Sequence, residues 1–424
     1  MEIRAVESDV IVIGGGAAGL FAACNMVESG LDVLLLEPNS RLARKLSITG
    51  KGRCNITNNC TPEEVIKNTA KNPKFLYSAV FGFTPTDIMK WFEDRGVPLK
   101  TERGGRVFPV SDKAGDVVGA LENTIKSRRC RIVRDKAVRI IKEDGAVKGV
   151  EGKKGEYLSK CVILATGGMS YPKTGSTGDG YMMAYELGHT VTEIKPSLIP
   201  IIVQENLFPD VCGLTLKNVT LSLFEQGKKS PLFSEIGEVT FTDYGIAGPL
   251  TLSASCFISS EKLEERKYKI VIDLKPGLTS EQLEKRIQRD FDEYPNKAFA
   301  DSLSRLLPSQ IIPDIVFLSG ISPQKPCAQI TKQEKTALAG LLKRFSLTPI
   351  GLRPIEEAII TSGGVSVKEI SPTTMESKLV KGLYFAGEII DCDALTGGYN
   401  LTIAFSTAYS AAQAIISTIL SKEV

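Results

Sequence analysis

The segment DVIVIGGGAAGLFAACNMVESGLDVLLLE, at residues 9–37, decides the fold of this chain. Its first residues, 9–13, form a short and continuous apolar run, which is typical of a strand that is covered on both faces. A glycine-rich turn follows at once, residues 20–29 have the composition of a helix, and residues 32–36 form a second apolar run. This order of strand, helix and strand predicts a βαβ unit and therefore a parallel α/β sheet.

The turn after the first strand contains Gly14, Gly16 and Gly19 in the spacing GxGxxG. In a Rossmann-type fold the first glycine permits the tight turn, the second lets a pyrophosphate approach the backbone, and the third lets helix and strand pack closely. The free N–H groups at the helix N-terminus attract phosphate. We therefore expect a dinucleotide to contact the residues of this turn, namely Gly14, Gly16, Ala17, Ala18 and Gly19.

An acidic residue, Glu37, ends the second strand 18 residues after Gly19. In this position a carboxylate accepts hydrogen bonds from the hydroxyls of the adenosine ribose. The same carboxylate disfavours a ribose 2′-phosphate, so this site is not expected to bind NADPH.

Two later segments favour FAD over NAD as the dinucleotide. CVILATGG, at 161–168, is similar to the second FAD-contacting strand of many flavoproteins, and GLYFAGEIID, at 382–391, is similar to their late ribityl–phosphate segment. The helix that begins near residue 398 would direct its N-terminal amides at the flavin. From these segments we expect non-covalent FAD to contact Ala165, Gly387, Asp391 as the first acidic candidate, Glu388 as the second, and Leu401.

The pattern of predicted secondary structure changes between residues 195 and 351. Short strand-like runs such as IPIIV, VTLSLF and YKIVIDL come first, and a charged helical stretch, TSEQLEKRIQRDFDEY, follows. After residue 351 the sequence again has the pattern of a strand, a turn and a helix. The sequence thus predicts an FAD-binding domain in two parts, 1–194 and 352–424, with an inserted β-rich and helical substrate domain at 195–351.

The composition limits the classes of function. The 424 residues carry a net charge of +3, which gives no reason to expect a nucleic-acid or membrane partner. Nine cysteines without a CxxC pair are typical of reduced thiols in the cytoplasm. No signal peptide is evident at the N-terminus, and no apolar run is expected to reach the ~20 residues that span a bilayer.

The chain has one histidine, His189, near the expected end of a helix. A metal site with several imidazoles is therefore excluded, and we expect no metal. A capping or solvated role is the interpretation for His189. Neither His189 nor Cys54 stands in a context that indicates covalent attachment of FAD.

Five blocks together carry a resemblance to a known family: KLSITGKGRCNITN at 45–58, GRVFPVSDKA at 105–114, LATGGMSYPKTGSTGDGYMMAYELGH at 164–189, TDYGIAGP at 242–249, and TMESKLVKGLYFAGEIIDCDALTGGYNLTIAFS at 374–406. The chain resembles the bacterial HI0933-like, or BaiN-type, FAD-dependent oxidoreductases, which include an aminoacetone oxidase. The resemblance runs over nearly the whole chain.

This resemblance implies an FAD domain like that of glutathione and fumarate reductases, interrupted by a substrate domain. It also implies that Lys45, Arg53 and Asn55 lie beside the flavin or the pyrophosphate, together with Thr166, Gly167, Gly387, Asp391, Gly398 and Asn400. One departure concerns Asp243, which stands where many members have histidine. If that histidine takes part in the reaction in those members, this protein must act differently, whereas a turn-capping role is open to aspartate.

The first hypothesis is an oxidoreductase that passes hydride between FAD and a small organic substrate held between the domains. Its reductase form takes electrons from transient NAD(P)H and saturates an activated C=C bond. Its oxidase form uses O₂ to oxidise amines or amino-ketones. Arg53 and Arg106 are candidates for holding an anionic or carbonyl-bearing substrate, with FAD phosphate binding or a structural ion pair as alternatives, and Tyr171 and Tyr399 are candidate proton donors.

Two other hypotheses belong to different classes. A disulfide oxidoreductase would use Cys54 and Cys60, but five residues separate these cysteines, whereas glutathione-reductase relatives have four between theirs. An FAD-bearing RNA-modification protein is disfavoured by the near-neutral charge. The expected partner is a small molecule, and the protein is expected to be a monomer or homodimer.

Overall fold

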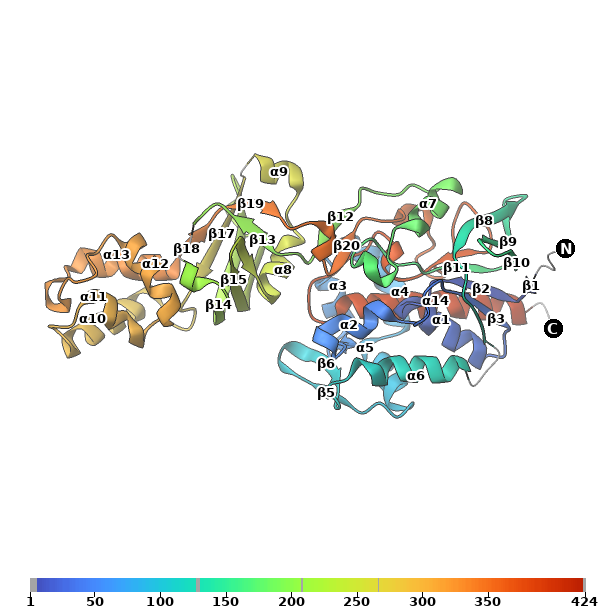
Figure 1. The fold of residues 1–424 in the computed structure, drawn as a ribbon, viewed down its shortest axis with the longest axis horizontal. Helices are drawn as coiled ribbons and strands as arrows, with labels where there is room; N and C mark the ends of the chain where they lie inside the picture. Colours follow the sequence, from blue (N-terminus) through green and yellow to red (C-terminus); the bar gives the residue numbers. More distant parts are fainter. Residues whose placement is uncertain (1–5, 127–129, 207–208, 266, 422–424) are drawn as a thin grey trace. The chain divides into compact units, whose positions relative to one another are not determined.

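In the computed structural model the chain is described over residues 6–126, 130–206, 209–265 and 267–421. It divides into two compact units (Figure 1): unit 1 consists of Met1–Ser197 with Pro354–Val424, and unit 2 of Leu198–Arg353. The assignment of these parts as an FAD domain and a substrate domain stays a prediction.

A five-stranded parallel sheet forms the centre of unit 1, with the strand order β21-β11-β2-β3-β7. Every residue of β2 and β3 is buried, because helices and loops cover both faces. This arrangement confirms the predicted α/β fold. The strands are β2 (Val10–Ile13), β3 (Val33–Leu36), β7 (Cys130–Val133), β11 (Val162–Leu164) and β21 (Leu383–Phe385).

Two long helices from opposite ends of the chain, α1 and α14, pack side by side in unit 1 (Figure 1). Phe21 of α1 and Phe405 of α14 meet with their ring centroids 5.0 Å apart. The helices of unit 1 are α1 (Ala17–Glu28), α2 (Arg44–Gly52), α3 (Pro62–Lys67), α4 (Tyr77–Gly82), α5 (Pro85–Glu93), α6 (Ala114–Lys126), α7 (Asp179–Glu186) and α14 (Tyr399–Leu420).

Helix α14 is long and apolar enough to cross a membrane by length and composition, with 22 residues. The expectation that no apolar run would reach this length was therefore wrong. More than half of its most apolar stretch is buried inside the protein, and Phe405, Ala408 and Ala412 are fully covered. Its composition is accounted for by packing against α1 in the core.

Smaller sheets complete unit 1. They are formed by β1 (Val6–Glu7), β10 (Glu156–Leu158), β9 (Ala146–Gly152) and β8 (Ala137–Glu143); by β4 (Thr57–Asn58), β6 (Arg106–Pro109) and β5 (Leu99–Thr101); and by β12 (Lys195–Ser197) with β20 (Ile360–Ser362).

The β12–β20 ribbon lies beside both points at which the chain passes between the units. Ser197, the last residue of β12, pairs with Ile360 in β20. The buried carboxylate of Asp393 accepts hydrogen bonds from the hydroxyls of Ser197 at 3.0 Å and Ser362 at 2.8 Å. One side chain thus holds both strands of the ribbon.

Unit 2 is built on a seven-stranded antiparallel sheet with the order β18-β17-β14-β15-β16-β13-β19. Its strands are β13 (Ile201–Val203), β14 (Thr215–Glu225), β15 (Phe233–Thr242), β16 (Gly245–Ala247), β17 (Tyr268–Asp273), β18 (Phe345–Leu347) and β19 (Pro349–Leu352). Its helices are α8 (Pro249–Ser255), α9 (Ser260–Glu264), α10 (Ser280–Glu293), α11 (Phe299–Ser302), α12 (Ile312–Ser319) and α13 (Lys332–Lys343).

Candidate functional site

Close packing between β2 and α1 requires glycine at two of the three GxGxxG positions, Gly14 and Gly19. A Cβ on Gly14 would lie 2.5 Å from the carbonyl oxygen of Ala165, and one on Gly19 would lie 1.9 Å from the carbonyl oxygen of Gly14. A Cβ on Gly16, by contrast, would have no atom within 4 Å. Because Gly16 is the N-cap of α1, this open space lies at the helix N-terminus, as a phosphate site requires.

The carboxylate of Glu37 is buried at the end of β3 and is oriented by three N–H groups. Oε2 accepts from the amide of Gly15 at 2.8 Å, and Oε1 accepts from the backbone and the side chain of Asn39 at 2.8 and 2.7 Å. A carboxylate has roughly four acceptor positions. Glu37 therefore retains capacity for a further donor such as a ribose hydroxyl.

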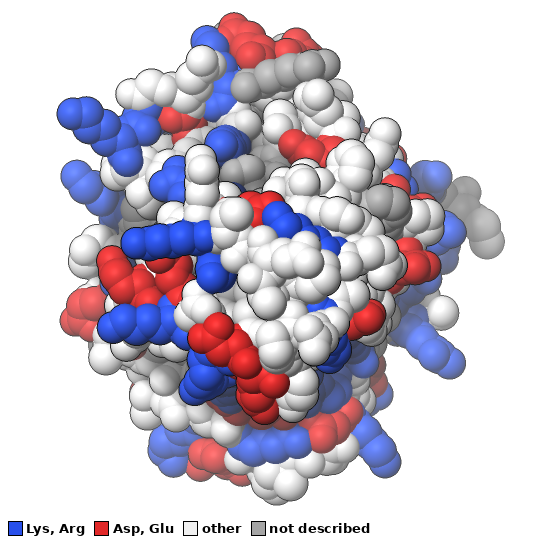
Figure 2. Space-filling view, turned by 90° about the vertical axis from the view of Figure 1, so that its left-hand side faces the viewer, with Lys and Arg blue, Asp and Glu red and all other residues white. Residues whose placement is uncertain are grey.

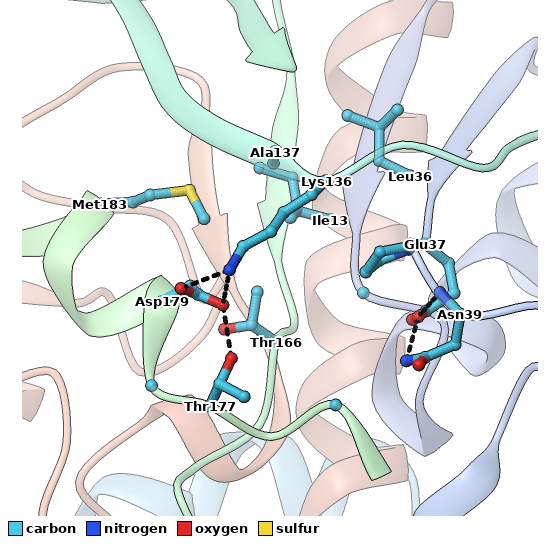
Figure 3. A pocket seen from close by; sticks show the side chains of 14 residues that line it. Ile13, Leu36, Glu37, Asn39, Lys136, Ala137, Thr166, Thr177, Asp179 and Met183 are labelled. Carbon is cyan, nitrogen blue, oxygen red and sulfur yellow. Dashed lines mark hydrogen bonds and ion pairs between the residues drawn. The ribbon is translucent and has the colours of Figure 1, made fainter. Parts of the chain in front are cut away.

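A pocket of about 180 Å³ lies at the ends of β2 and β3 (Figure 3). Thr166 is among the residues that line it, and the buried hydroxyl oxygen of Thr166 has no hydrogen-bond partner among the described residues. A buried polar atom without a partner beside a pocket is a candidate for contact with a bound ligand. The wall consists of Ile13, Gly14, Leu36, Glu37, Pro38, Asn39, Lys136, Ala137, Thr166, Gly175, Thr177, Gly178, Asp179 and Met183.

The late segment of the chain lies against the start of α1. Gly387, which has a φ of +76°, begins the short 3₁₀ helix η10 (Gly387–Ile389), and a Cβ there would lie 2.8 Å from the Cβ of Ala18. Its amide donates to the hydroxyl of Thr407 in α14 at 3.0 Å. The structure thus brings the GxGxxG turn and the AGE segment together.

An ion pair joins Lys45 of α2 to Glu388 of η10. Lys45 Nζ lies 2.6 Å from Glu388 Oε2 and 2.6 Å from Ser170 Oγ. The other carboxylate oxygen, Oε1, accepts from the amide of Thr361 at 2.8 Å. The sequence predictions did not include Ser170 or Thr361, because a lone hydroxyl residue carries no recognisable pattern.

Asp391, the first acidic candidate in the late segment, is paired inside the protein. Its Oδ1 lies 2.7 Å from Lys71 Nζ, and its Oδ2 accepts from the side chain of Asn72 at 3.2 Å. Its side chain is 6% exposed, whereas that of Glu388 is 21% exposed. Of the two carboxylates, Glu388 is therefore the more accessible to a ligand.

The N-terminus of α14 is approached closely by β4. Gly398, the N-cap, has a φ of +104°, and a Cβ there would lie 2.3 Å from the carbonyl oxygen of Thr57. The hydroxyls of Thr57 and Thr402 are 2.8 Å apart. Asn400 holds the preceding loop, because its side chain bonds both the amide and the carbonyl of Ala394, at 3.0 and 2.7 Å.

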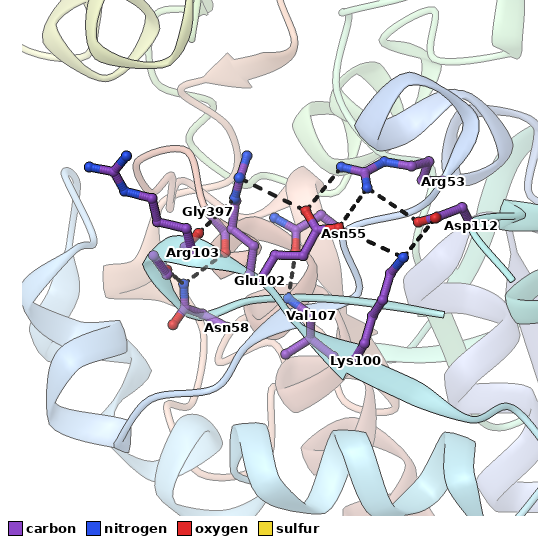
Figure 4. A network of polar contacts seen from close by, with 11 residues as sticks. Arg53, Asn55, Asn58, Lys100, Glu102, Arg103, Val107, Asp112 and Gly397 are labelled. Atoms are coloured by element: carbon purple, nitrogen blue, oxygen red, sulfur yellow. Dashed lines mark hydrogen bonds and ion pairs between the residues drawn. The ribbon is translucent and has the colours of Figure 1, made fainter. Parts of the chain in front are cut away.

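Asn58 links the same helix end to the β5–β6 hairpin (Figure 4). Its side-chain Nδ2 donates to the carbonyl oxygens of Gly104, at 2.9 Å, and Gly397, at 3.0 Å. Because Asn58 pairs with Arg106 in the β4–β6 ladder, Arg106 lies one strand away from the residue that contacts the α14 N-terminus. Asn55 supports the hairpin by accepting from the amide of Val107 at 3.1 Å.

Arg53 forms a structural ion-pair network beside this hairpin (Figure 4). Its Nη1 lies 2.8 Å from Glu102 and 3.2 Å from Asp112, and its guanidinium stacks 4.0 Å from the centre of the Phe108 ring. Hydrogen bonds with Glu102 raise the pKa of Arg53. Two carboxylates thus occupy this guanidinium.

Arg106 is less occupied by acidic partners than Arg53 is. Its Nε donates to the carbonyl oxygen of Arg103 at 3.1 Å, and its Nη2 is 4.0 Å from Glu102. Its side chain is 41% exposed. The sequence could not distinguish the two arginines, because both stand in similar polar motifs.

The two cysteines considered for a redox pair, Cys54 and Cys60, are free thiols in the structure. Burial raises the pKa of Cys54 to about 12, and burial together with the charge of Glu64 raises the pKa of Cys60 to about 11. Both thiols are therefore protonated at neutral pH and are weak nucleophiles.

His189 is buried, so of the two predicted roles the solvated one was wrong, whereas the backbone amide of His189 does bond to the carbonyl oxygen of Ala184 at the end of α7. Its Nε2 lies 2.8 Å from Ser377 Oγ, and its Nδ1 lies 3.2 Å from Glu369 Oε2. The ring also meets Phe385 edge to face. These contacts are those of a structural residue, which lies just after the C-terminal end of α7.

The remaining candidates lie in different places. Tyr171 has a left-handed backbone, with a φ of +52°, and Tyr399 is the first residue of α14. Asp243 is exposed in the turn between β15 and β16 of unit 2. Within the described ranges, no cluster of three or more His, Cys, Asp or Glu is placed to hold a metal ion.

Comparisons with known proteins cover nearly the whole chain. The family described as HI0933-like protein Rossmann domain matches residues 8–414. A 3-dehydro-bile acid delta(4,6)-reductase of Clostridium scindens is 30% identical over 407 residues, which cover 95% of this chain and 98% of that protein. A ribosomal RNA dihydrouridine synthase of Haemophilus influenzae is 31% identical over 415 residues, which cover 96% of this chain and 98% of that protein.

Solved structures show the same fold. A 3-ketosteroid delta1-dehydrogenase from Sterolibacterium denitrificans superposes with a TM-score of 0.53 at 14% identity, and the match covers 97% of this chain and 100% of that chain. At this identity the likeness concerns the fold alone.

Proposed function

Because the chain belongs to the HI0933-like family of FAD-dependent oxidoreductases, we propose that it reduces a carbon–carbon double bond conjugated to a carbonyl group. Two relatives of nearly equal length support this reaction class. The names of both, a bile acid delta(4,6)-reductase and a dihydrouridine synthase, describe the saturation of such a bond, in a steroid ring and in a uracil ring.

We assign the FAD site to the residues that surround the GxGxxG turn. The open space before Gly16 suits the pyrophosphate, Glu37 suits the adenosine ribose, and the unpartnered hydroxyl of Thr166 suits a polar atom of the cofactor. Glu388 is our choice over Asp391 for the late segment, because its carboxylate is less enclosed. The other residues proposed to line the site are Ala17, Ala18, Gly19, Lys45, Asn55, Ala165, Gly167, Gly387, Gly398, Asn400 and Leu401. Arg53 is not among them, because Glu102 and Asp112 occupy its guanidinium.

The observation that carries the proposed reaction is the link from the α14 N-terminus through Asn58 to Arg106. Reduced FAD would supply a hydride when it is bound, and a proton delivered by Tyr171, Tyr399 or solvent would complete the saturation of the bond. The N-terminal amides of α14 favour negative charge beside them. We propose that the guanidinium of Arg106, which is 41% exposed, donates a hydrogen bond to the carbonyl oxygen of the substrate and so stabilises the charge that develops there.

We further propose that NAD(P)H is the transient electron donor. The sequence has no second GxGxxG turn, so a nicotinamide would visit and leave rather than occupy its own domain. The alternative is an oxidase of amines or amino-ketones that reoxidises with O₂. Free cysteines support a cytoplasmic location, and a monomer or homodimer is expected.

The first experiment follows the flavin absorbance near ~450 nm in an anaerobic stopped-flow instrument after NADH or NADPH is added. Fast bleaching, with slow return in air, is the result expected of a reductase. Fast return in air, with turnover of amines, would favour the oxidase. A colourless protein that takes up no FAD would overturn the assignment of the cofactor.

RNA uridine is the second candidate substrate, and the Haemophilus influenzae relative is the observation that favours it. On the face shown in Figure 2, however, Lys and Arg side chains are interspersed with Asp and Glu and form no continuous basic area. Because the net charge of the whole chain is only +3, we rank a small unsaturated ketone first. Consumption of NAD(P)H with a steroid enone and with unmodified ribosomal RNA, compared side by side, decides between them.

A further inference from the structure

The outer wall of the pocket in Figure 3 is the segment 174–179, which leads into α7. Two glycines give it its path. Gly175 has a φ of +111°, and a Cβ there would lie 2.5 Å from the side-chain nitrogen of Asn39. Gly178, with a φ of +82°, is the N-cap of α7. Residues with a side chain rarely adopt these two positive φ values. The two glycines therefore allow the segment to lie close against the rest of the pocket.

Two side-chain links hold this wall to the body of unit 1. On one side, Asn39 Nδ2 donates to Glu37 Oε1 at 2.7 Å and to the carbonyl oxygen of Thr174 at 3.3 Å. On the other side, Lys136 Nζ lies 2.9 Å from each oxygen of the Asp179 carboxylate. The hydroxyl of Thr177 also donates to Asp179.

Lys136 and Asp179 come from different elements, and their side chains meet at the pocket. Lys136 precedes β8, Asp179 begins α7, and Figure 3 shows the lysine side chain reaching to the carboxylate near Thr166. Burial acts to raise the pKa of Asp179, but the hydrogen bonds with Thr177 and Lys136 outweigh it and lower that pKa. The carboxylate is therefore ionised at neutral pH, and the link is a true ion pair.

We propose that Lys136 and Asp179 form a clasp that closes the pocket over the adenosine part of FAD and limits the rate at which FAD leaves. The inference rests on the proposed assignment of FAD to this pocket. Neither residue is part of the GxGxxG turn or of the acidic position at the end of β3. Both side chains are 40% exposed, so water competes with the pair and its effect on the rate of FAD release is modest.

An alternative role for Lys136 predicts a different result. A lysine at a nucleotide pocket can contact the cofactor directly, with Asp179 as a competitor for its ammonium group. In that case removal of the Asp179 charge frees Lys136 and slows the release of FAD. In a clasp, removal of either partner opens the wall and speeds release. The two roles therefore give opposite signs for the Asp179→Asn variant.

The test measures FAD release from the holoprotein by the rise in flavin fluorescence after dilution, for Lys136→Ala, Asp179→Asn and the double variant. We expect each single variant to release FAD about two- to fivefold faster than the parent protein. The double variant should release at the rate of the single ones, because both changes break the same link. Salt should speed release from the parent protein but not from Lys136→Ala.

Lys148→Ala is the matched control, because it removes an exposed lysine that pairs with Glu143 at 3.1 Å on the β8–β9 hairpin, outside the pocket lining. Unchanged release in both single variants, or slower release in Asp179→Asn, would overturn the clasp. Thermal unfolding of the FAD-free forms separates a folding defect from faster release. A parent protein that binds no FAD would instead refute the proposed function itself.

Discussion

Lys45 and Glu388 lie 343 residues apart in the chain and form an ion pair with a Nζ–Oε2 distance of 2.6 Å. Lys45 follows the first βαβ unit and Glu388 precedes α14. This contact therefore joins the N-terminal and C-terminal segments of unit 1. Ser170 contributes a third segment, because its hydroxyl bonds both charged groups. The candidate site is thus a meeting point of three distant stretches of chain.

Removing one charge of this pair should destabilise unit 1. Glu388→Gln and Lys45→Met are each expected to lower the free energy of unfolding by about 1–3 kcal/mol, because each leaves a half-buried charge without its partner. The double variant should lose less than the sum of the single losses. Denaturant unfolding of the FAD-free protein measures all three, and strict additivity would show that the two residues do not interact.

Arg106→Lys should lower turnover without loss of FAD. Loss of a directed donor at a developing oxyanion typically lowers kcat by about 10²–10³ fold. Arg53→Lys should act mainly on stability, because Glu102 and Asp112 already occupy that guanidinium. Steady-state kinetics with flavin content and Tm measured in parallel will separate the effects. Equal turnover in Arg106→Lys and the parent protein would remove Arg106 from the reaction.

Gly16→Ala and Gly19→Ala should fail in different ways. A methyl group at Gly19 would lie 1.9 Å from the carbonyl oxygen of Gly14, so Gly19→Ala should lower the stability of the FAD-free protein by about 1–3 kcal/mol or more. At Gly16 the φ is −83° and the space is open, so Gly16→Ala should leave that stability unchanged. FAD titration should nevertheless show weakened binding in Gly16→Ala, because the methyl group enters the expected phosphate position. FAD binding of parental strength in this variant would contradict the proposed position of the pyrophosphate.

The stability of the protein should decrease as the pH falls through the ordinary pKa of histidine, about 6.5. Burial lowers the pKa of His189, although Glu369 acts in the opposite direction. His189 therefore binds a proton more tightly in the unfolded state than in the folded state. Its contribution to the free energy of unfolding is complete above the ordinary pKa and is lost as the pH falls below it. Ser377 Oγ accepts from the amides of Leu379 and Val380, so its own proton is left for the neutral ring.

His189→Gln tests this dependence. The free energy of unfolding, measured by denaturant at several pH values between about 5 and 8, should fall less steeply on acidification in the variant, by up to about 1.4 kcal/mol per pH unit. Parallel curves for the two proteins would assign the acid sensitivity to the carboxylates instead.

The parts of the fold that depend on local sequence could be predicted. The apolar runs at 9–13 and 32–36, with the glycine turn between them, are sufficient to specify the βαβ unit, because strand burial and tight turns leave a direct mark on residue type. Glu37 could be located for the same reason, since its offset from Gly19 is fixed by the length of one helix and one strand.

Contacts between distant segments could not be predicted. Nothing near Asp391 in the sequence indicates its pairing with Lys71, and nothing near Arg53 indicates Glu102. Lys136 and Asp179 reach the same pocket only because β8 and α7 are placed there by tertiary packing. The burial of His189 was missed because helix periodicity ends before it, and its partners Glu369 and Ser377 lie far along the chain.

The β12–β20 ribbon has an evolutionary consequence. The chain leaves unit 1 after Ser197 and returns through residues 354–359 to Ile360, which is the ladder partner of Ser197. The exit and the return are therefore neighbours, and Asp393 fastens both strands from within unit 1. An insert of a different size can be joined to these two neighbouring strands without altering the register of the parallel sheet. The segment between the two junctions can thus change in length during evolution while the parallel sheet keeps its strand order.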